Sequence, residues 1–420
     1  MNKRSKKQSP REVVPQRSVQ VGEVVVDVAA EFRELLVKGG LAIATALFSQ
    51  EMEKLCGPRY GREEGLASRW GRRRGEVVLG GRKVKLSRPR VRKDGAEVEL
   101  ETYAQLQRED PLDDRALEQM LVGVSTRKYE RSLEPIIPDL APFATSKSAV
   151  SRRFVAKTKA QLDAALSRPL GDQSWVTLLI DGIAFHEHVV LIVLGIDERG
   201  GKHVLAFREG STENATLCRQ MLADIVERGV PADRSILVVI DGGKGLRKAV
   251  TEVFGKYALV QRCQVHKKRN VLDHLPDELR VQVRSAMNQA YGAASHAIAL
   301  SQLQNVARSL AKKQPSAAAS LREGLDETLT VKQLGITGWL AKTLETTNPI
   351  ENLNRGVRRV GGRVDRCRSG AMALRWVATG ALESATGFRR LKGHKDISKL
   401  VVALRSRDAQ LDAANVSRAG

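Results

Sequence analysis

Apolar and polar positions follow two different patterns along the middle of this 420-residue chain. Short runs of apolar, mostly β-branched residues are typical of buried strands, and amphipathic stretches with a three- to four-residue spacing indicate helices. The runs predict five strands, at residues 175–181, 189–197, 202–207, 235–241 and 257–261. Helices are predicted between the later strands, at residues 213–228 and 244–254.

The order of these elements restricts the fold class. Three consecutive strands joined by tight turns precede a helix–strand–helix–strand series, which is the order of a ribonuclease H-like mixed sheet. A plain doubly wound fold would alternate from the start and usually carries a glycine-rich phosphate loop. Residues 242–245 are glycine-rich but lack the spacing of a Walker loop. We therefore expect an α/β chain with a ribonuclease H-like mixed-sheet core.

The rest of the chain is mainly helical in pattern, apart from one small basic β element. Apolar residues recur every three or four positions over residues 21–56 and 265–344, and the second of these stretches fits an all-helical insertion into the core. In the basic β element, Gly80-Gly81 and then Asp94-Gly95 each separate two alternating stretches, so two β-hairpins are expected.

The predicted elements divide the chain into six segments. They are a disordered basic tail (1–20), a helical segment with basic β-hairpins (21–112), a helix-turn-helix-like DNA-binding region (113–170), the first part of the core (171–264), the helical insertion (265–344) and a further set of basic helices (345–420). An Arg-Pro-Leu-Gly sequence at residues 168–171 marks the boundary before the core.

The third segment resembles a helix-turn-helix unit, with helices expected at residues 116–122, 126–136 and 146–166. The last of these has the composition of a recognition helix, whose polar and basic side chains reach phosphates and base edges in a major groove. The candidate DNA-contacting residues are Lys147, Ser148, Ser151, Arg152 and Arg153. An ordinary helical hairpin is the alternative interpretation.

The charge of the chain indicates a polyanionic partner. Lys and Arg outnumber Asp and Glu enough to give a formal net charge of +22 and a pI near 10.1, while hydrophobic residues make up 42% of the chain, enough for globular domains. The basic residues gather in residues 57–95 and 352–395. Nucleic acid is therefore the expected partner. An acidic membrane surface is a weaker alternative, because no basic amphipathic anchor or lipidation motif is present.

The cysteines and the apolar stretches bear on location. The four cysteines are widely spaced and form no Cys-x-x-Cys pair, so neither a disulfide framework nor a zinc finger is indicated. No apolar stretch reaches the length of a membrane span, and the N-terminal residues lack the apolar core of a signal peptide. We expect a cytoplasmic protein without a membrane partner.

Three acidic residues are candidates for metal binding. Asp181 and Asp241 each end a predicted strand and precede glycine, and Glu351 falls at the start of a predicted helix. Acids at the ends of two strands of one sheet can converge on a divalent cation, for which carboxylate oxygens are suitable ligands. Each residue also has a simpler interpretation. Asp-Gly after a strand makes a good turn, and Glu351 would occupy the capping-box position behind an Asn348 N-cap and Pro349.

The segments that carry these acids resemble the catalytic signatures of Mutator-like bacterial insertion-sequence transposases. The resemblance spans roughly residues 60–391 and is most specific at residues 262–270 and 346–355. It implies a DDE transposase, in which Asp181, Asp241 and Glu351 hold two Mg²⁺ ions, with Mn²⁺ as a possible substitute. It also implies a ribonuclease H-like catalytic core interrupted by the helical insertion before the glutamate.

The function implied is that of a transposase that binds the terminal inverted repeats of its own insertion sequence and cuts and joins DNA. Its expected partners are double-stranded repeat and target DNA, with a homodimer forming on DNA in the bacterial nucleoid. Two alternatives remain open from the residues alone. One is a ribonuclease H-like nuclease or resolvase without strand transfer, and the other is a transposase-derived protein that only binds DNA.

Five further residues are singled out without a settled role. Arg355 and Arg358 follow Glu351 on its predicted helix and are candidates for DNA contact, although a solvated basic face is the alternative. Cys263 and His266 form the Cys-x-x-His part of the resemblance, and the simpler interpretation is a buried thiol with a hydrogen-bonded histidine. Trp339 is expected in the core more readily than stacked on a flipped base.

Overall fold

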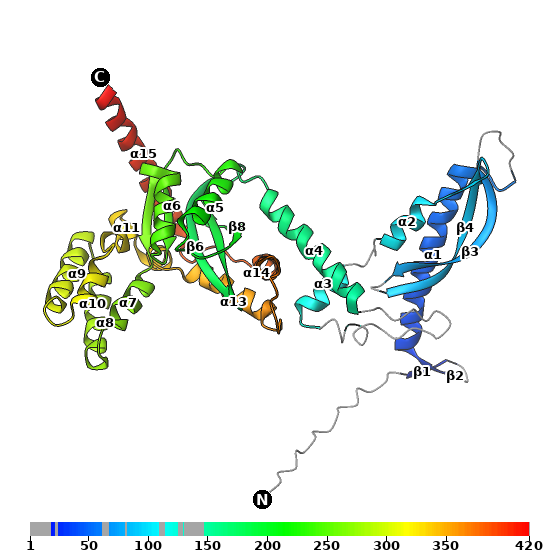
Figure 1. Cartoon of the computed structure of the whole chain (residues 1–420), viewed down its shortest axis with the longest axis horizontal. Coiled ribbons are helices and arrows are strands. Elements are labelled where there is room, and N and C mark those ends of the chain that lie inside the picture. The colour runs from blue at the N-terminus through cyan, green and yellow to red at the C-terminus, as the bar shows by residue number, and fades with distance from the viewer. Residues whose placement is uncertain are drawn as a thin grey trace, which may run out of the picture. The chain divides into compact units, whose positions relative to one another are not determined.

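The structure is a computed structural model, shown in Figure 1. It describes residues 18–21, 24–60, 67–79, 82–108, 114–124, 129 and 147–419. The chain forms two compact units, Met1–Ala156 and Lys157–Gly420, which we describe in turn. No helix in the described part of the chain is long and apolar enough to cross a membrane.

The N-terminal unit begins with a short β-hairpin. Strands β1 (Ser18–Val21) and β2 (Val24–Asp27) pair antiparallel, and helix α1 (Val28–Cys56) follows directly. The helix predicted from residue 21 therefore begins later, at Val28, and most of the predicted tail (1–20) lies outside the described residues. The sequence is valine-rich here, and β-branched residues favour strands over the first turns of a helix.

A three-stranded antiparallel sheet packs against α1. Its strands are β3 (Ser68–Leu79), β4 (Arg82–Lys93) and β5 (Ala96–Val98), so both predicted hairpins are confirmed. Asp94 and Gly95 have φ angles of 49° and 81°, the positive values that a two-residue hairpin turn requires. The sheet and α1 share a core with helix α2 (Glu101–Arg108), which the sequence pattern did not predict.

The predicted helix-turn-helix region is described only in part. Helix α3 (Asp114–Leu121) and helix α4 (Lys147–Ser167) match the first and third predicted helices. The second prediction, at residues 126–136, lies outside the described residues except for Tyr129. That tyrosine is buried and forms a small apolar cluster with Val150 of α4.

The C-terminal unit is built on a five-stranded mixed sheet in the order β10-β9-β6-β7-β8. Its strands are β6 (Trp175–Phe185), β7 (His188–Asp197), β8 (Lys202–Glu209), β9 (Ile236–Ile240) and β10 (Ala258–Arg262). The first three pair antiparallel, whereas β9 pairs parallel with both β6 and β10. The predicted α/β class and the order of its elements are confirmed.

Helices cover both faces of this sheet. Helices α5 (Ala215–Glu227) and α6 (Lys244–Phe254) share an apolar core with one face, to which Leu178 and Ile180 of β6 contribute. Helices α13 (Asn348–Gly361) and α14 (Gly370–Thr386) lie against the strands from β6 to β8, as Figure 1 shows, and helix α15 (Ile397–Ala419) ends the chain.

A helical region with its own apolar core lies between β10 and α13. It contains α7 (Gln264–Asp273), α8 (Asp277–Tyr291), α9 (His296–Leu310), α10 (Pro315–Arg322), α11 (Thr330–Gln333) and α12 (Gly338–Leu344). Short 3₁₀ turns occupy Gly255–Tyr257, Asp326–Thr328 and His394–Asp396. The predicted helical character of residues 265–344 is confirmed.

Buried polar contacts join this helical region to the edge of the sheet. The Gln261 amide on β10 donates to the Thr328 carbonyl at 2.9 Å and accepts from the Val331 backbone N–H at 2.9 Å. Within the helical region itself, Lys267 is only 4% exposed, and its ammonium donates to the carbonyls of Ser320 and Glu323 at 2.8 and 2.7 Å. These bonds satisfy groups that burial would otherwise leave unpaired.

Candidate active site

The two aspartates lie on neighbouring strands of the central sheet. The parallel register of β6 and β9 ends with the pair Ile180 and Ile240, so Asp181 and Asp241 are the next residues along the chain. Neighbouring strands are about 4.8 Å apart, which brings the two backbones close together. Asp241 follows the end of β9, as predicted. The prediction that Asp181 ends its strand is wrong, because β6 continues to Phe185 through its pairing with β7.

Asp181 is held in an environment that disfavours its charge. It is 9% exposed, and burial is the main reason that its pKa rises to about 6, with the neighbouring charge of Asp241 adding to the effect. The Gly182 backbone N–H donates to Asp181 Oδ1 at 2.9 Å, and the Asn354 amide donates to Asp181 Oδ2 at 3.0 Å. The carboxylate is therefore fixed in orientation by two hydrogen-bond donors.

Asn354 connects Asp181 to the helix that carries Glu351. Both residues lie on α13, three positions apart, and so occupy the same side of the helix. Asn354 is 2% exposed, and its Oδ1 has no hydrogen-bond partner among the described protein atoms. We did not identify this residue from sequence. Its only signal was an asparagine at a helical position where spacing predicts an apolar side chain.

Glu351 is positioned by Thr347 at the start of α13. The N-cap is Thr347, one residue before the predicted Asn348, and its side chain does not cap the helix. The Thr347 hydroxyl instead donates to Glu351 Oε1 at 2.8 Å, while its carbonyl accepts from the Glu351 N–H at 2.9 Å. The predicted capping box is therefore wrong, because the helix is capped one residue earlier and the Thr347 hydroxyl binds the Glu351 carboxylate instead of a backbone N–H.

Cys263 and His266 lie beside Glu351. The Cys263 thiol is buried and accepts from the Thr347 N–H at 3.4 Å, and Thr347 Oγ1 is 3.3 Å from the same sulfur. His266 Nδ1 is 3.4 Å from Thr347 Oγ1, and His266 Nε2 is 3.9 Å from Glu351 Oε1. The prediction of a buried thiol and a hydrogen-bonded histidine is confirmed, and the motif lies next to the candidate glutamate.

Cys263 and His266 also shift each other's pKa values. Burial raises the pKa of the Cys263 thiol, but hydrogen bonds from His266 and Thr347 outweigh it and leave that pKa below its ordinary value. The pKa of His266 is raised, first by its hydrogen bond to Cys263 and then by the charges of Asp181 and Glu351. A protonated His266 thus offsets part of the negative charge of the acids.

The three acids influence one another electrostatically, but they are not close enough together to form a complete metal site. Asp241 and Glu351 both raise the pKa of Asp181. Within the described residues, no three His, Cys, Asp or Glu side chains lie close enough together to hold a metal ion as they stand.

The candidate DNA-contacting residues divide between the two units. On α4, Lys147, Ser148, Ser151 and Arg152 are exposed and Arg153 is half-buried. On α13, Arg355 and Arg358 are exposed, on the helix that carries Glu351. The expectation that Trp339 belongs to the core is wrong. It is 56% exposed, and its ring lies 3.4 Å from the Lys392 ammonium and 5.0 Å from that of Lys342.

Comparison with known proteins identifies the class of the chain. The profile described as "Transposase, Mutator family" matches residues 18–382, which is most of the sequence. This defines a transposase. The chain belongs to the Mutator family of transposases, and the resemblance noted in its motifs is confirmed.

Individual relatives agree with this assignment. The chain is 30% identical over 244 residues to the transposase for insertion sequence element IS6120 of Mycolicibacterium smegmatis, covering 57% of this chain and 73% of the relative. It is 29% identical over 282 residues to the transposase for element ISRM5 of Rhizobium meliloti, covering 66% and 69%. The transposase for element IS256 in transposon Tn4001 of Staphylococcus aureus is 27% identical over 257 residues, covering 58% and 62%.

Proposed function

We propose that this chain is a DDE transposase that binds the terminal inverted repeats of its own insertion sequence and catalyses metal-dependent DNA strand cleavage and strand transfer. The observation that carries the proposal is the contact between Asn354 and Asp181. It links the two aspartates of adjacent strands to the helix that bears Glu351, within one unit of a Mutator-family chain.

We further propose that the central sheet is a ribonuclease H-like core. The strand order and directions support it, since three antiparallel strands are followed by two parallel ones on the other side of the first strand. The helical region enters between the last strand and the glutamate helix. Both features agree with the element order expected for an interrupted core of this kind.

The donor set suits Mg²⁺ or Mn²⁺, of which two ions are proposed. Asp181, Asp241 and Glu351 would supply hard carboxylate oxygens, and the raised pKa of Asp181 indicates negative charge that a divalent cation would neutralise. When bound, such ions make a water or 3′-hydroxyl more nucleophilic and stabilise the leaving oxygen of an in-line displacement at phosphorus. No serine or tyrosine nucleophile is needed for this chemistry.

The protein's own residues orient the acids. The Asn354 amide and the Gly182 N–H hold the two oxygens of Asp181, so its carboxylate plane is fixed by the sheet and by α13 together. Thr347 holds Glu351 at the N-terminal turn of α13. Such orientation lowers the entropy cost of reaching the reactive arrangement.

Recognition of DNA is assigned to the basic surfaces. The exposed residues of α4 are proposed to read the terminal repeats, and Arg355 and Arg358 are proposed to contact phosphates near the acids. The net charge of +22 favours binding to a polyanion and a strong dependence on salt. A protein acting in this way would associate with the bacterial nucleoid.

We propose a homodimer on DNA, because two element ends must be processed together and a two-fold symmetric protein fits two symmetric repeats. Helix α1 supports this proposal as the contact. Its Leu35, Ile43 and Leu47 are 64%, 66% and 41% exposed, while its other side packs on the N-terminal sheet. Mass measurement of the complex with paired ends tests it, and one chain per two ends would refute it.

The test of the function uses DNA carrying one end of the element, identified as the imperfect inverted repeats that flank the reading frame. The full chain with Mg²⁺ should cut at the repeat boundary and join the freed 3′ end to a second DNA. Ca²⁺ should support binding without cleavage. Cleavage without joining would support a nuclease or resolvase instead, and robust cleavage in chelator would exclude the metal mechanism.

A further inference from the structure

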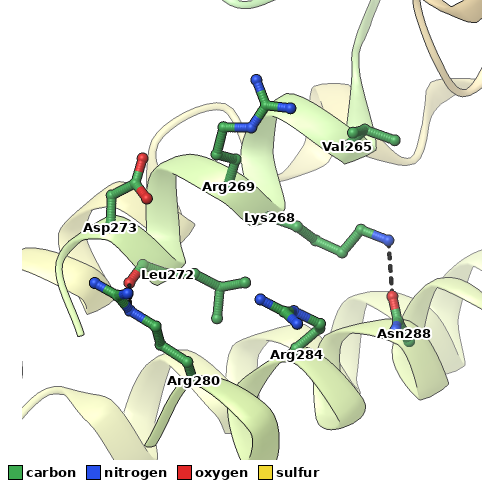
Figure 2. Close-up of a pocket in the computed structure, with 8 residues that line it drawn as sticks. All are labelled: Val265, Lys268, Arg269, Leu272, Asp273, Arg280, Arg284 and Asn288. Carbon is green, nitrogen blue, oxygen red and sulfur yellow. Dashed lines mark hydrogen bonds between the residues drawn. The ribbon is translucent and has the colours of Figure 1, made fainter. Parts of the chain in front are cut away.

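A basic cavity of about 280 Å³ lies between helices α7 and α8 in the helical region. Figure 2 shows its lining residues: Lys268 of α7 extends toward Asn288 of α8, while the Arg269 side chain points to the side of α7 away from α8. Lys268 and Arg269 come from α7, and Arg280 and Arg284 come from α8, against a single acid, Asp273. None of these residues belongs to the site described above.

Two of the four cations are already used within the protein. Arg280 donates to the Leu272 and Leu275 carbonyls at 3.1 and 3.0 Å and pairs with Asp277 at 2.7 Å. Lys268 donates one of its three N–H groups to Asn288 Oδ1 at 2.7 Å. Arg280 therefore has a structural role, while Lys268 keeps two donors for another partner.

The other two cations, Arg269 and Arg284, are exposed and have no hydrogen bond or ion pair with any described residue. Arg284 also faces Lys268, since its charge helps burial to lower the pKa of that lysine. Like charges that face each other destabilise the free protein. A bound anion would relieve this repulsion, and guanidinium groups bind phosphate oxygens in a bidentate manner.

The position of the cavity favours a DNA phosphate. His266 and Arg269 lie on the same helix, three residues or about 4.5 Å of helix rise apart. His266 Nε2 is itself 3.9 Å from Glu351. Phosphates on one DNA strand are spaced about 3.4 Å along the duplex axis, so a strand that enters the candidate active site has further phosphates within reach of α7.

We propose that Lys268, Arg269 and Arg284 form a binding site for backbone phosphates of the DNA strand that approaches the three acids. The inference rests on the proposed function, because it takes DNA at the acids as its starting point. It adds that the helical region holds this strand by charge and donor geometry and does not read its bases.

The first experiment compares full-length variants for binding to a short fluorescein-labelled DNA duplex of fixed sequence, in chelator, so that no cleavage is required. The double variant Arg269→Gln/Arg284→Gln should bind at least about fivefold more weakly, and the slope of log K against log salt should fall by about 0.9 for each lost phosphate contact. Its melting temperature should be unchanged or higher, because the repulsion with Lys268 is gone.

The matched control is Lys312→Gln/Lys313→Gln, which removes the same charge from exposed positions after α9, outside the cavity. The control should keep wild-type affinity within about twofold, the change expected from net charge alone. Equal losses in the two double variants would overturn the proposal, since they would show a general charge effect.

The second experiment measures acylation of Lys268 by mass spectrometry in the wild-type chain. The DNA duplex should protect Lys268, and inorganic phosphate at the same phosphate concentration should not. Equal protection by inorganic phosphate would show that the site binds a free anion and not a DNA strand. No protection by either would overturn the proposed site. If DNA protects Lys268 but the chain never cuts DNA, the proposed function is disproved while the phosphate-binding site still holds.

Discussion

The two sheets of this protein carry charge in opposite ways. In the N-terminal sheet, β4 alternates exposed and buried residues, as in Lys83, Val84 and Lys85, because one face packs on α1 and the other meets solvent. In the central sheet, Leu178, Leu179 and Ile180 are all fully buried, because helices cover both faces. The first sheet carries charged residues along one whole face, whereas the second buries Asp181 at the point where the neighbouring strand β9 ends.

This difference separates two tasks of a DNA-processing protein. A solvated face can carry many cations at little cost, which suits contact with phosphates. A covered sheet holds its few acids rigidly, at the cost of raising the pKa of Asp181. Substitutions of exposed basic residues should therefore change DNA binding, and substitutions of Asp181, Asp241 and Glu351 should change the cleavage rate.

The largest effect is expected at the acids. Asp181→Ala, Asp241→Ala and Glu351→Gln should each lower the cleavage rate at least about 100-fold, as loss of a catalytic group does, while binding to repeat DNA stays nearly intact. Gel-shift and cleavage assays on the same preparations separate the two. A variant that keeps more than about a tenth of wild-type cleavage would exclude its residue from the catalytic set.

Asp181 also predicts an effect of pH on stability. Its pKa rises from 3.8 to about 6, so its contribution to stability is present below pH 3.8 and is lost as the pH rises through about 6. At pH 8 without metal, Asp181→Asn should raise the free energy of unfolding by up to about 3 kcal/mol. Denaturant unfolding measures it, and the gain should shrink toward pH 4.

The control for this experiment is the exposed Asp273, whose change to Asn should have no comparable effect. Addition of Mg²⁺ should narrow the difference between wild type and Asp181→Asn, because a cation neutralises the buried carboxylate. A gain that is equally large at pH 4 and pH 8 would contradict the electrostatic explanation.

Loss of the threonine hydroxyl should have a smaller effect on cleavage. Thr347→Val removes the donor to Glu351 and should lower cleavage about 10- to 100-fold, the range seen when a partner of a metal ligand is removed. Thr347→Ser keeps the hydroxyl and is the matched control. Rates that are equal for the Val and Ser variants would show that Thr347 does not position the glutamate.

The smallest effect is expected for the basic residues of helix α4. Arg152→Ala/Arg153→Ala should weaken binding to repeat DNA by about 3- to 10-fold and lower its salt dependence, without changing the cleavage rate at saturating protein. Fluorescence anisotropy across a salt series measures it, with Lys312→Ala/Lys313→Ala as the charge-matched control. A loss confined to the cleavage rate would reverse the assigned division of tasks.

Much of the central sheet could be predicted from sequence, because runs of apolar β-branched residues are typical of strands that are buried on both faces. The course of β6 past Asp181 could not, since it depends on pairing with β7 on one side after β9 has ended on the other. The hydrophobic pattern reports burial, but it does not report which of two neighbours a strand keeps.

The candidate acids could be proposed from their strand and helix positions, while the residues that orient them could not. Thr347 was expected outside the helix cap, and Asn354 has no motif of its own. Asn354 acts through its contact with Asp181, 173 residues away, and Thr347, which bonds Glu351, is itself in contact with Cys263, 84 residues away. Spacing along one element carries no signal for such contacts.

The buried polar contacts between β10 and the helical region limit how this protein can be re-engineered or shortened. Deleting the residues from α7 to α12 would leave the Gln261 amide at the sheet edge without its hydrogen-bond partners. Each unpaired group would cost about 1–3 kcal/mol of stability. Chimeras with related transposases should therefore exchange β10 and the helices together. A compact version of the enzyme would need Gln261 replaced by an apolar side chain before the helices are removed.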